Sequence, residues 1–166
     1  MNQINNSKKI YHAAIYVRLS KEDGDVATAG KRESNSISNQ KNLIKNFLKD
    51  KKDIVVVSER VDDGYSGSNF NRPGFQRMME DAKAGRIKSI VIKDFSRFGR
   101  DYLEVGNYLE KILPVLGIRI ISINDGFDSI NSSGFTGGMS VALKNMLNAM
   151  YSRDLSRKVR SAMKTH

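Results

Sequence analysis

Short apolar runs alternate along this chain with longer segments in which apolar residues recur at helical spacing. Such runs are typical of buried strands, and they predict strands at about 12–18, 54–57, 89–92 and 118–123. Between them, apolar residues gather on one face of three predicted helices, near 36–49, 73–84 and 101–115. Strands that alternate with helices predict an α/β fold: a mainly parallel sheet of four or five strands, flanked by helices.

Local signals support the predicted helix ends. Ser36 lies among several possible N-caps of the first helix. Pro73 suits the first turn of the second helix, because its φ is fixed and its missing N–H is not needed there. Gly85 and Gly117 are expected just beyond the ends of the second and third helices, where left-handed backbone is common. The polar segment 21–35 has no periodicity and predicts a mobile loop.

A further helix is predicted at the C-terminal end, from about residue 137 onward. No stop signal follows, which predicts that the chain is truncated within this helix. We therefore divide the chain into an α/β domain at 1–138 and a long C-terminal helix at 139–166. Apolar residues at approximately helical spacing carry this prediction: Met139, Leu143, Met146, Met150, Leu155, Val159 and Ala162.

Composition narrows the function classes. The 166 residues include 28 Lys and Arg against 18 Asp and Glu, a formal net charge of +10. A domain this basic favours a polyanionic partner such as nucleic acid, although a basic surface that only confers solubility is the alternative. There is no cysteine, and the two histidines, His12 and His166, lie near the ends, which argues against thiol chemistry and histidine-based sites. The sequence contains neither a membrane span nor a signal peptide, so we expect a cytoplasmic protein.

Candidate chemistry follows the predicted strands. Ser20 comes just after the first strand, and Arg18 shares its face because side chains alternate along a strand. Arg72 follows the second strand, and Arg97 and Arg100 follow the third. The carboxyl ends of parallel strands meet at one edge of a sheet, so these residues should converge there. Guanidinium groups match the oxygens of a phosphodiester, which predicts attack of a hydroxyl on a phosphate.

Four motifs in order resemble the catalytic domain of serine recombinases, the resolvase/invertase superfamily. The long polar loop after Ser20 resembles the large serine recombinases of mobile elements. The resemblance covers about residues 12–160 and rests on these motifs: Arg18–Ser20, Ser36–Gln40, Asp63–Gly67 continuing to Arg72–Phe75, and Arg97–Asp101.

The resemblance implies a site-specific recombinase that breaks and rejoins DNA without a metal or other cofactor. Ser20 would be the nucleophile, forming a covalent 5′-phosphoserine intermediate, and Gln40 would support the site. The family also implies homo-oligomers, a dimer that becomes a tetramer in the active synaptic complex. The phosphate would be surrounded by arginines: Arg18, Arg72, Arg97 and Arg100.

One residue departs from the family pattern. Many relatives have Asp immediately before the first Arg of the last motif, where this chain has Ser96. The group that would protonate the leaving oxygen is therefore not assigned. Asp94 lies two positions away, and we expect it to act as an N-cap or in an ion pair rather than in catalysis.

Two other functions remain open at this point. A non-catalytic DNA-binding regulator on the same fold would share the basic charge. A metal-dependent nuclease would need clustered carboxylates, and the adjacent pair Asp62–Asp63 could suggest a metal site. We interpret that pair as turn-forming residues before Gly64.

The second half of the C-terminal helix is basic. Arg153, Arg157, Arg160 and Lys164 recur at intervals of three or four residues, and Lys158 adds to the charge. We expect Arg153, Arg157, Lys158 and Arg160 to bind the DNA backbone, with a solvated helix face as the alternative. The methionines of the first half fit either a core or an assembly surface.

Overall fold

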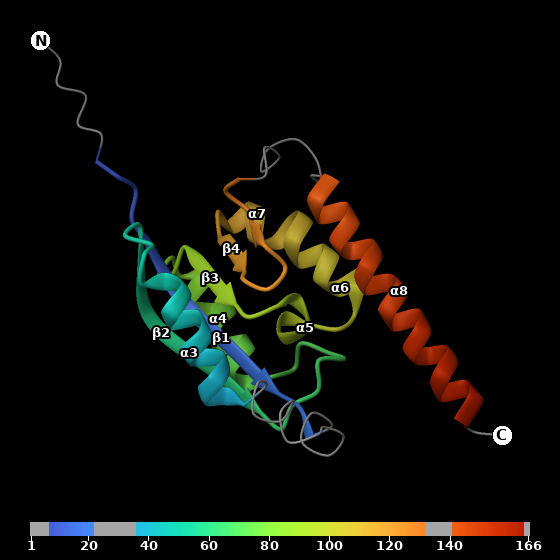
Figure 1. Cartoon of the computed structure of the whole chain (residues 1–166). Helices are drawn as coiled ribbons and strands as arrows, with labels where there is room; N and C mark the ends of the chain where they lie inside the picture. The colour runs from blue at the N-terminus through green and yellow to red at the C-terminus, as the bar shows by residue number, and fades with distance from the viewer. Residues whose placement is uncertain (1–6, 22–35, 132–140, 165–166) are drawn as a thin grey trace, which may run out of the picture.

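The computed structural model describes residues 7–21, 36–131 and 141–164. Its centre is a five-stranded sheet in the order β2-β1-β3-β4-β5 (Figure 1). Strands β1 to β4 are parallel, and β5 is antiparallel to β4. The predicted α/β fold is therefore confirmed. The strands are β1 (Tyr11–Leu19), β2 (Ile54–Asp63), β3 (Ser89–Ile92), β4 (Arg119–Ser122) and β5 (Phe127–Asp128).

Helices cover both faces of the sheet. Helix α3 (Ile37–Leu48) packs on one face, against alternate residues of β1 such as Ile15 and Val17. The opposite face carries the larger core, which includes Tyr16 of β1. The elements that build this larger core are α4 (Pro73–Lys83), α5 (Phe95–Phe98), α6 (Tyr102–Asn107), η1 (Tyr108–Ile112), α7 (Leu113–Leu116) and α8 (Val141–Lys164).

The predicted helix signals are confirmed at three ends. The Ser36 hydroxyl accepts a hydrogen bond from the Asn39 N–H at 3.2 Å and caps α3. Gly85 and Gly117 have φ of +76° and +69°, so each adopts the left-handed backbone expected after a helix. The predicted loop at 21–35 lies almost wholly outside the described residues.

The second predicted strand is correct in type but wrong in burial. Strand β2 is an edge strand that pairs with β1 alone, and it continues to Asp63. Its apolar run is between 39% and 50% exposed at Val55, Val56 and Val57. A register shift opposite Ala13 and Ala14 leaves one residue of this run without a direct partner. An apolar run therefore indicated a strand but not its place in the sheet.

The predicted helix at 101–115 is a chain of three segments, α6, η1 and α7. The middle segment is a π-helical turn, in which the Leu113 N–H bonds to the Tyr108 carbonyl. Pro114 follows directly; its ring would clash with the carbonyl four residues earlier in a regular α-helix. The wider turn accommodates the proline without ending the helix.

Helix α8 projects beyond the sheet domain (Figure 1). Met150 is buried, and Met146 and Leu147 are partly buried against the larger core. Beyond Met150 the apolar side chains are exposed: Tyr151, Leu155, Val159 and Met163 are between 45% and 75% accessible. The first half of the helix thus anchors it, and the second half presents its apolar residues outward.

Candidate active site

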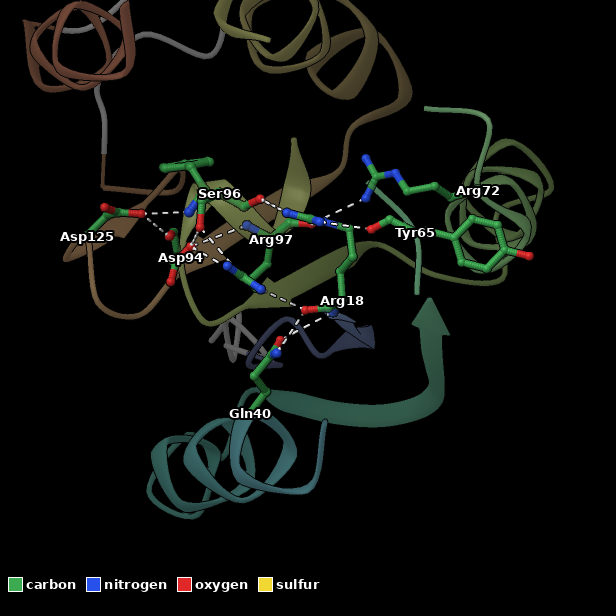
Figure 2. Close-up of polar contacts among 10 residues, drawn as sticks. Arg18, Gln40, Tyr65, Arg72, Asp94, Ser96, Arg97 and Asp125 are labelled. Carbon is green, nitrogen blue, oxygen red and sulfur yellow. Dashed lines mark hydrogen bonds and ion pairs between the residues drawn. The ribbon is translucent and has the colours of Figure 1, made fainter. Parts of the chain in front are cut away.

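The carboxyl ends of β1, β2 and β3 bring together residues that are far apart in sequence (Figure 2). Ser20 directly follows β1 and is 4% exposed. Arg18, two residues earlier, is fully buried. The clustering of arginines around Arg18 is the geometry that the strand–loop pattern predicted.

The Arg18 guanidinium donates to three main-chain carbonyls. Nη2 bonds to Ser96 O at 2.6 Å, Nη1 to Tyr65 O at 3.0 Å, and Nε to Arg97 O at 3.2 Å. These carbonyls lie on the loop after β2 and on the turn after β3. One side chain from β1 therefore ties together the loops that follow the neighbouring strands.

Gln40 holds the backbone of Arg18. It is fully buried on α3, its Nε2 donates to Arg18 O at 2.9 Å, and its Oε1 accepts from Arg18 N at 3.3 Å. Arg97 Nη1 donates to the same carbonyl at 3.0 Å. The amide of Gln40 thus fixes the end of β1, the strand that leads into Ser20.

Arg72 is also part of this cluster and is 1% exposed. Its Nη1 donates to the Tyr16 hydroxyl at 2.6 Å and to Arg97 O at 3.3 Å. Further bonds reach the carbonyls of Asn69 and Phe98. The rings of Tyr16, Phe70 and Phe75 lie 5.0–5.5 Å from the guanidinium carbon, close enough for cation–π attraction.

Sequence reasoning missed the pair that supports Arg72. Tyr16 donates to an Asp62 oxygen at 2.7 Å, and Asp62 also accepts the N–H groups of Gly74 and Phe75 at 2.8 and 2.9 Å. Asp62 is 1% exposed at the end of β2, so its interpretation as a turn residue was wrong. Burial is the main cause that raises the pKa of Tyr16. The alternation that placed Arg18 also places Tyr16 on its face, and this was the available signal.

Arg97 and Arg100 complete the cluster. Arg97 lies on α5 and is 5% exposed, and Arg100 is partly buried. The Arg100 N–H donates to Gly67 O at 2.8 Å. A Cβ at Gly67 would lie 2.7 Å from Arg18 Nη2 and 2.9 Å from Arg100 Cγ, so only glycine fits between the two side chains.

The cluster is electrostatically unfavourable for its own members. Burial is the main cause that lowers the pKa of Arg18, and together with the positive charges of Arg97, Arg100 and Arg72 it brings this pKa to about 9. Arg18 remains protonated at pH 7, but its charge is disfavoured by its surroundings. An anion at this edge of the sheet would relieve that cost, and a phosphate would also match the guanidinium geometry.

The expected role of Asp94 is confirmed. Asp94 is the N-cap of α5, and its Oδ1 accepts from the Arg97 N–H at 3.3 Å. It also lies 3.9 Å from Arg97 Nε and accepts a hydrogen bond from the Ser96 hydroxyl. The turn that carries Arg97 therefore contains its own carboxylate.

The predicted DNA-binding residues lie on α8, which packs against α6. Arg153, Arg157, Lys158 and Arg160 are all exposed. Lys158 forms a surface ion pair with Asp154 at 3.1 Å. These side chains lie on a different element from the buried arginine cluster and form a second basic region.

In the part of the chain that the structure describes, no helix is long and apolar enough to cross a bilayer. The same residues include no group of three or more His, Cys, Asp or Glu side chains that could hold a metal ion. The pair Asp62 and Asp63 is accordingly not part of a larger carboxylate group in the described ranges.

The fold and site define a parallel α/β domain with a serine and an arginine cluster at the carboxyl edge of its sheet. The family model described as the N-terminal domain of resolvases matches residues 13–166. The chain therefore belongs to the resolvase family of serine recombinases, as the sequence motifs indicated. No curated protein sequence matches the chain.

Solved structures show the same fold. The N-terminal catalytic domain of TP901-1 integrase superimposes with a TM-score of 0.63 at 19% identity, covering 89% of this chain and 98% of that one. A resolvase family site-specific recombinase from Streptococcus pneumoniae gives 0.57 at 24%, covering 93% of both chains. The catalytic domain of ISC1926 TnpA, an IS607-like serine recombinase, gives 0.52 at 23%, covering 68% and 70%. At these identities the likeness supports the fold alone.

Proposed function

We propose that this chain is the catalytic domain of a site-specific DNA recombinase with Ser20 as nucleophile. The observation that carries the proposal is the buried cluster of arginines around the end of β1, directly before Ser20. In the proposed step, the Ser20 Oγ–P bond forms as the P–O3′ bond breaks. The 5′ phosphate stays on the serine, a 3′ hydroxyl leaves, and the reverse reaction rejoins DNA.

The arginines would stabilise the charge that develops on the non-bridging oxygens. Guanidinium groups remain charged and bind two oxygens in a planar fork, which suits a phosphate in transfer. Arg18 and Arg72 currently donate to main-chain carbonyls, so at least some of these bonds must be exchanged for bonds to phosphate oxygens. Gln40 would serve by holding the backbone between Arg18 and Ser20.

Helix α8 would supply the assembly surface and a DNA contact. Its exposed apolar residues Tyr151, Leu155 and Val159 suit packing against a second copy of the helix, consistent with a dimer and a tetrameric synapse. Its exposed arginines would follow the phosphate backbone. Arg157→Gln combined with Arg160→Gln should reduce the salt slope of DNA binding by about 2, because each lost phosphate contact removes about 0.9. An unchanged slope would leave α8 as an assembly element.

The decisive experiment is capture of a covalent adduct. The full-length protein is incubated with a random-sequence duplex library, and DNA that stays attached after detergent denaturation is sequenced. We expect protein on 5′ ends, formation of the adduct in excess EDTA, and its loss in Ser20→Ala with DNA binding retained. Cleavage without an adduct that requires Mg²⁺ would favour a nuclease. Binding without cleavage would favour a DNA-binding regulator.

A further inference from the structure

The turn from Asp94 to Arg97 contains a chain of polar contacts that ends on an active-site arginine. The Ser96 hydroxyl donates to Asp94 Oδ1 and accepts from Arg97 Nε at 3.4 Å (Figure 2). The carboxylate itself lies 3.9 Å from the same Nε. Ser96 thus stands between a negative and a positive side chain and is hydrogen-bonded to both.

This contact chain holds one end of the Arg97 guanidinium while the strand holds the other. Nε faces Ser96, and Nη1 donates to Arg18 O at 3.0 Å. A planar guanidinium that is bound at both Nε and Nη1 has its orientation defined. The contact at Ser96 therefore sets the direction in which the remaining face of Arg97 points.

The turn is fixed to the sheet by a second carboxylate. Asp125 accepts the Phe95 N–H at 2.9 Å and the hydroxyl of Ser122, the last residue of β4, at 2.6 Å. The Ser96 carbonyl accepts from Arg18 at 2.6 Å. Backbone and side chain of Ser96 are consequently both engaged, one with Arg18 and the other with Arg97.

We infer that Asp94 and Ser96 are positioning residues for Arg97, with Ser96 transmitting the carboxylate charge to its Nε. This inference rests on the proposed function, in which Arg97 acts on the phosphate. Neighbouring hydrogen bonds polarise one another, so a hydroxyl bonded to a carboxylate is a better acceptor for a guanidinium than an isolated hydroxyl. The role requires the charge of Asp94, whereas capping α5 does not.

Asparagine separates these two roles. Asn is as good an N-cap as Asp, so Asp94→Asn should keep the helix and its thermal stability while removing the charge. Asp101→Asn is the matched control, since Asp101 caps α6 through the N–H groups of Leu103 and Glu104. Ser96→Ala removes the intermediate hydroxyl, and Ser96→Thr keeps it.

The rate of adduct formation in a single turnover is the first readout. A misplacement of about 1 Å can cost about 100-fold, so we expect Asp94→Asn and Ser96→Ala to be about 10- to 100-fold slower. DNA affinity and melting temperature should stay at the wild-type values. Ser96→Thr and Asp101→Asn should react at nearly the wild-type rate. Adding Ser96→Asp to Asp94→Asn returns a carboxylate beside Arg97 and should recover much of the loss.

The second readout needs no DNA. The Arg97 Nε–H resonance of the labelled protein should exchange faster with water in Asp94→Asn and Ser96→Ala, but not in Asp101→Asn. If Asp94→Asn keeps both the wild-type rate of adduct formation and the wild-type exchange of the Arg97 Nε–H, the inference is wrong and Asp94 serves only as the N-cap of α5. If even the wild-type protein forms no adduct, the proposed function fails, and the exchange measurement alone decides whether Asp94 and Ser96 position Arg97.

Discussion

Two buried arginines at opposite ends of the sheet have opposite surroundings. Arg119, at the start of β4, donates to both oxygens of Asp128 at 2.9 and 2.6 Å and to Asp53 at 2.8 Å. Hydrogen bonding to Asp128 is the main cause that raises the pKa of Arg119 above its ordinary value. Arg18, at the end of β1, instead donates to carbonyls and lies among other arginines, and its pKa is lowered to about 9.

The difference separates an arginine that stabilises the fold from one whose proposed role is to bind a phosphate. The charge of Arg119 is compensated inside the protein by Asp128 and Asp53. Through these bonds Arg119 links β4 to β5 and to the segment before β2. The charge of Arg18 is tolerated at a cost in stability. Buried groups whose charge is disfavoured by their neighbours mark functional sites more often than structural ones.

The largest expected effect is on strand cleavage. Arg18→Lys should slow adduct formation by about 10³-fold or more, because lysine is a point charge and cannot replace a planar fork. Arg119→Lys, the matched change at the other end of the sheet, should alter the cleavage rate little. Single-turnover rates on the captured duplex measure both. Equal rates for the two variants would remove the distinction between the arginines.

The next effect is on the free energy of unfolding, where replacing Arg119 should cost more than replacing Arg18. Arg119→Met leaves Asp53 and Asp128 without their shared partner, and because both are partly accessible to water we expect a loss of about 2–3 kcal/mol in unfolding free energy. Arg18→Met should cost less than about 1 kcal/mol, since relief of repulsion offsets the lost hydrogen bonds. Urea unfolding provides the comparison. A larger loss in Arg18→Met would make Arg18 the structural member of the pair.

A smaller effect should come from a simple anion. Inorganic phosphate at tenfold its Kd would stabilise the wild-type protein by about 1.4 kcal/mol through binding to the folded state alone. Melting temperatures in sodium phosphate and in sodium chloride of equal ionic strength should reveal it. Arg119→Met should retain the response and Arg18→Met should lose it. A response that survives in Arg18→Met would place the anion elsewhere.

The smallest effect is a pH dependence at Tyr16, the buried hydroxyl that supports Arg72. Its pKa is raised in the folded protein, mainly by burial, so the unfolded chain loses this proton first as pH rises through 10. Stability contributed by Tyr16 is therefore lost above pH 10, by about 0.8 kcal/mol at pH 10.5. Tyr16→Phe should lack this part of the alkaline decline. Parallel pH profiles for the two proteins would show that Tyr16 ionises equally in both states.

The local elements were predictable because their signals lie within a few residues. The cap at Ser36, the proline at the start of α4 and the glycines after α4 and α7 act on the backbone next to them. The position of Ser20 after a strand, with Arg18 on its face, follows from the alternation of side chains alone. Even the convergence of the arginines followed from the rule that parallel strands end at one edge.

The sequence by itself therefore determined the strand–helix alternation, the family motifs and the residues that reach the carboxyl edge. Only the tertiary structure decided that β2 is an edge strand with exposed valines, since strand order is a property of the whole sheet. It also decided which partner each polar group finds. Tyr16 meets Asp62 across 46 positions and Arg18 meets Arg97 across 79, and no local pattern encodes contacts between residues so far apart.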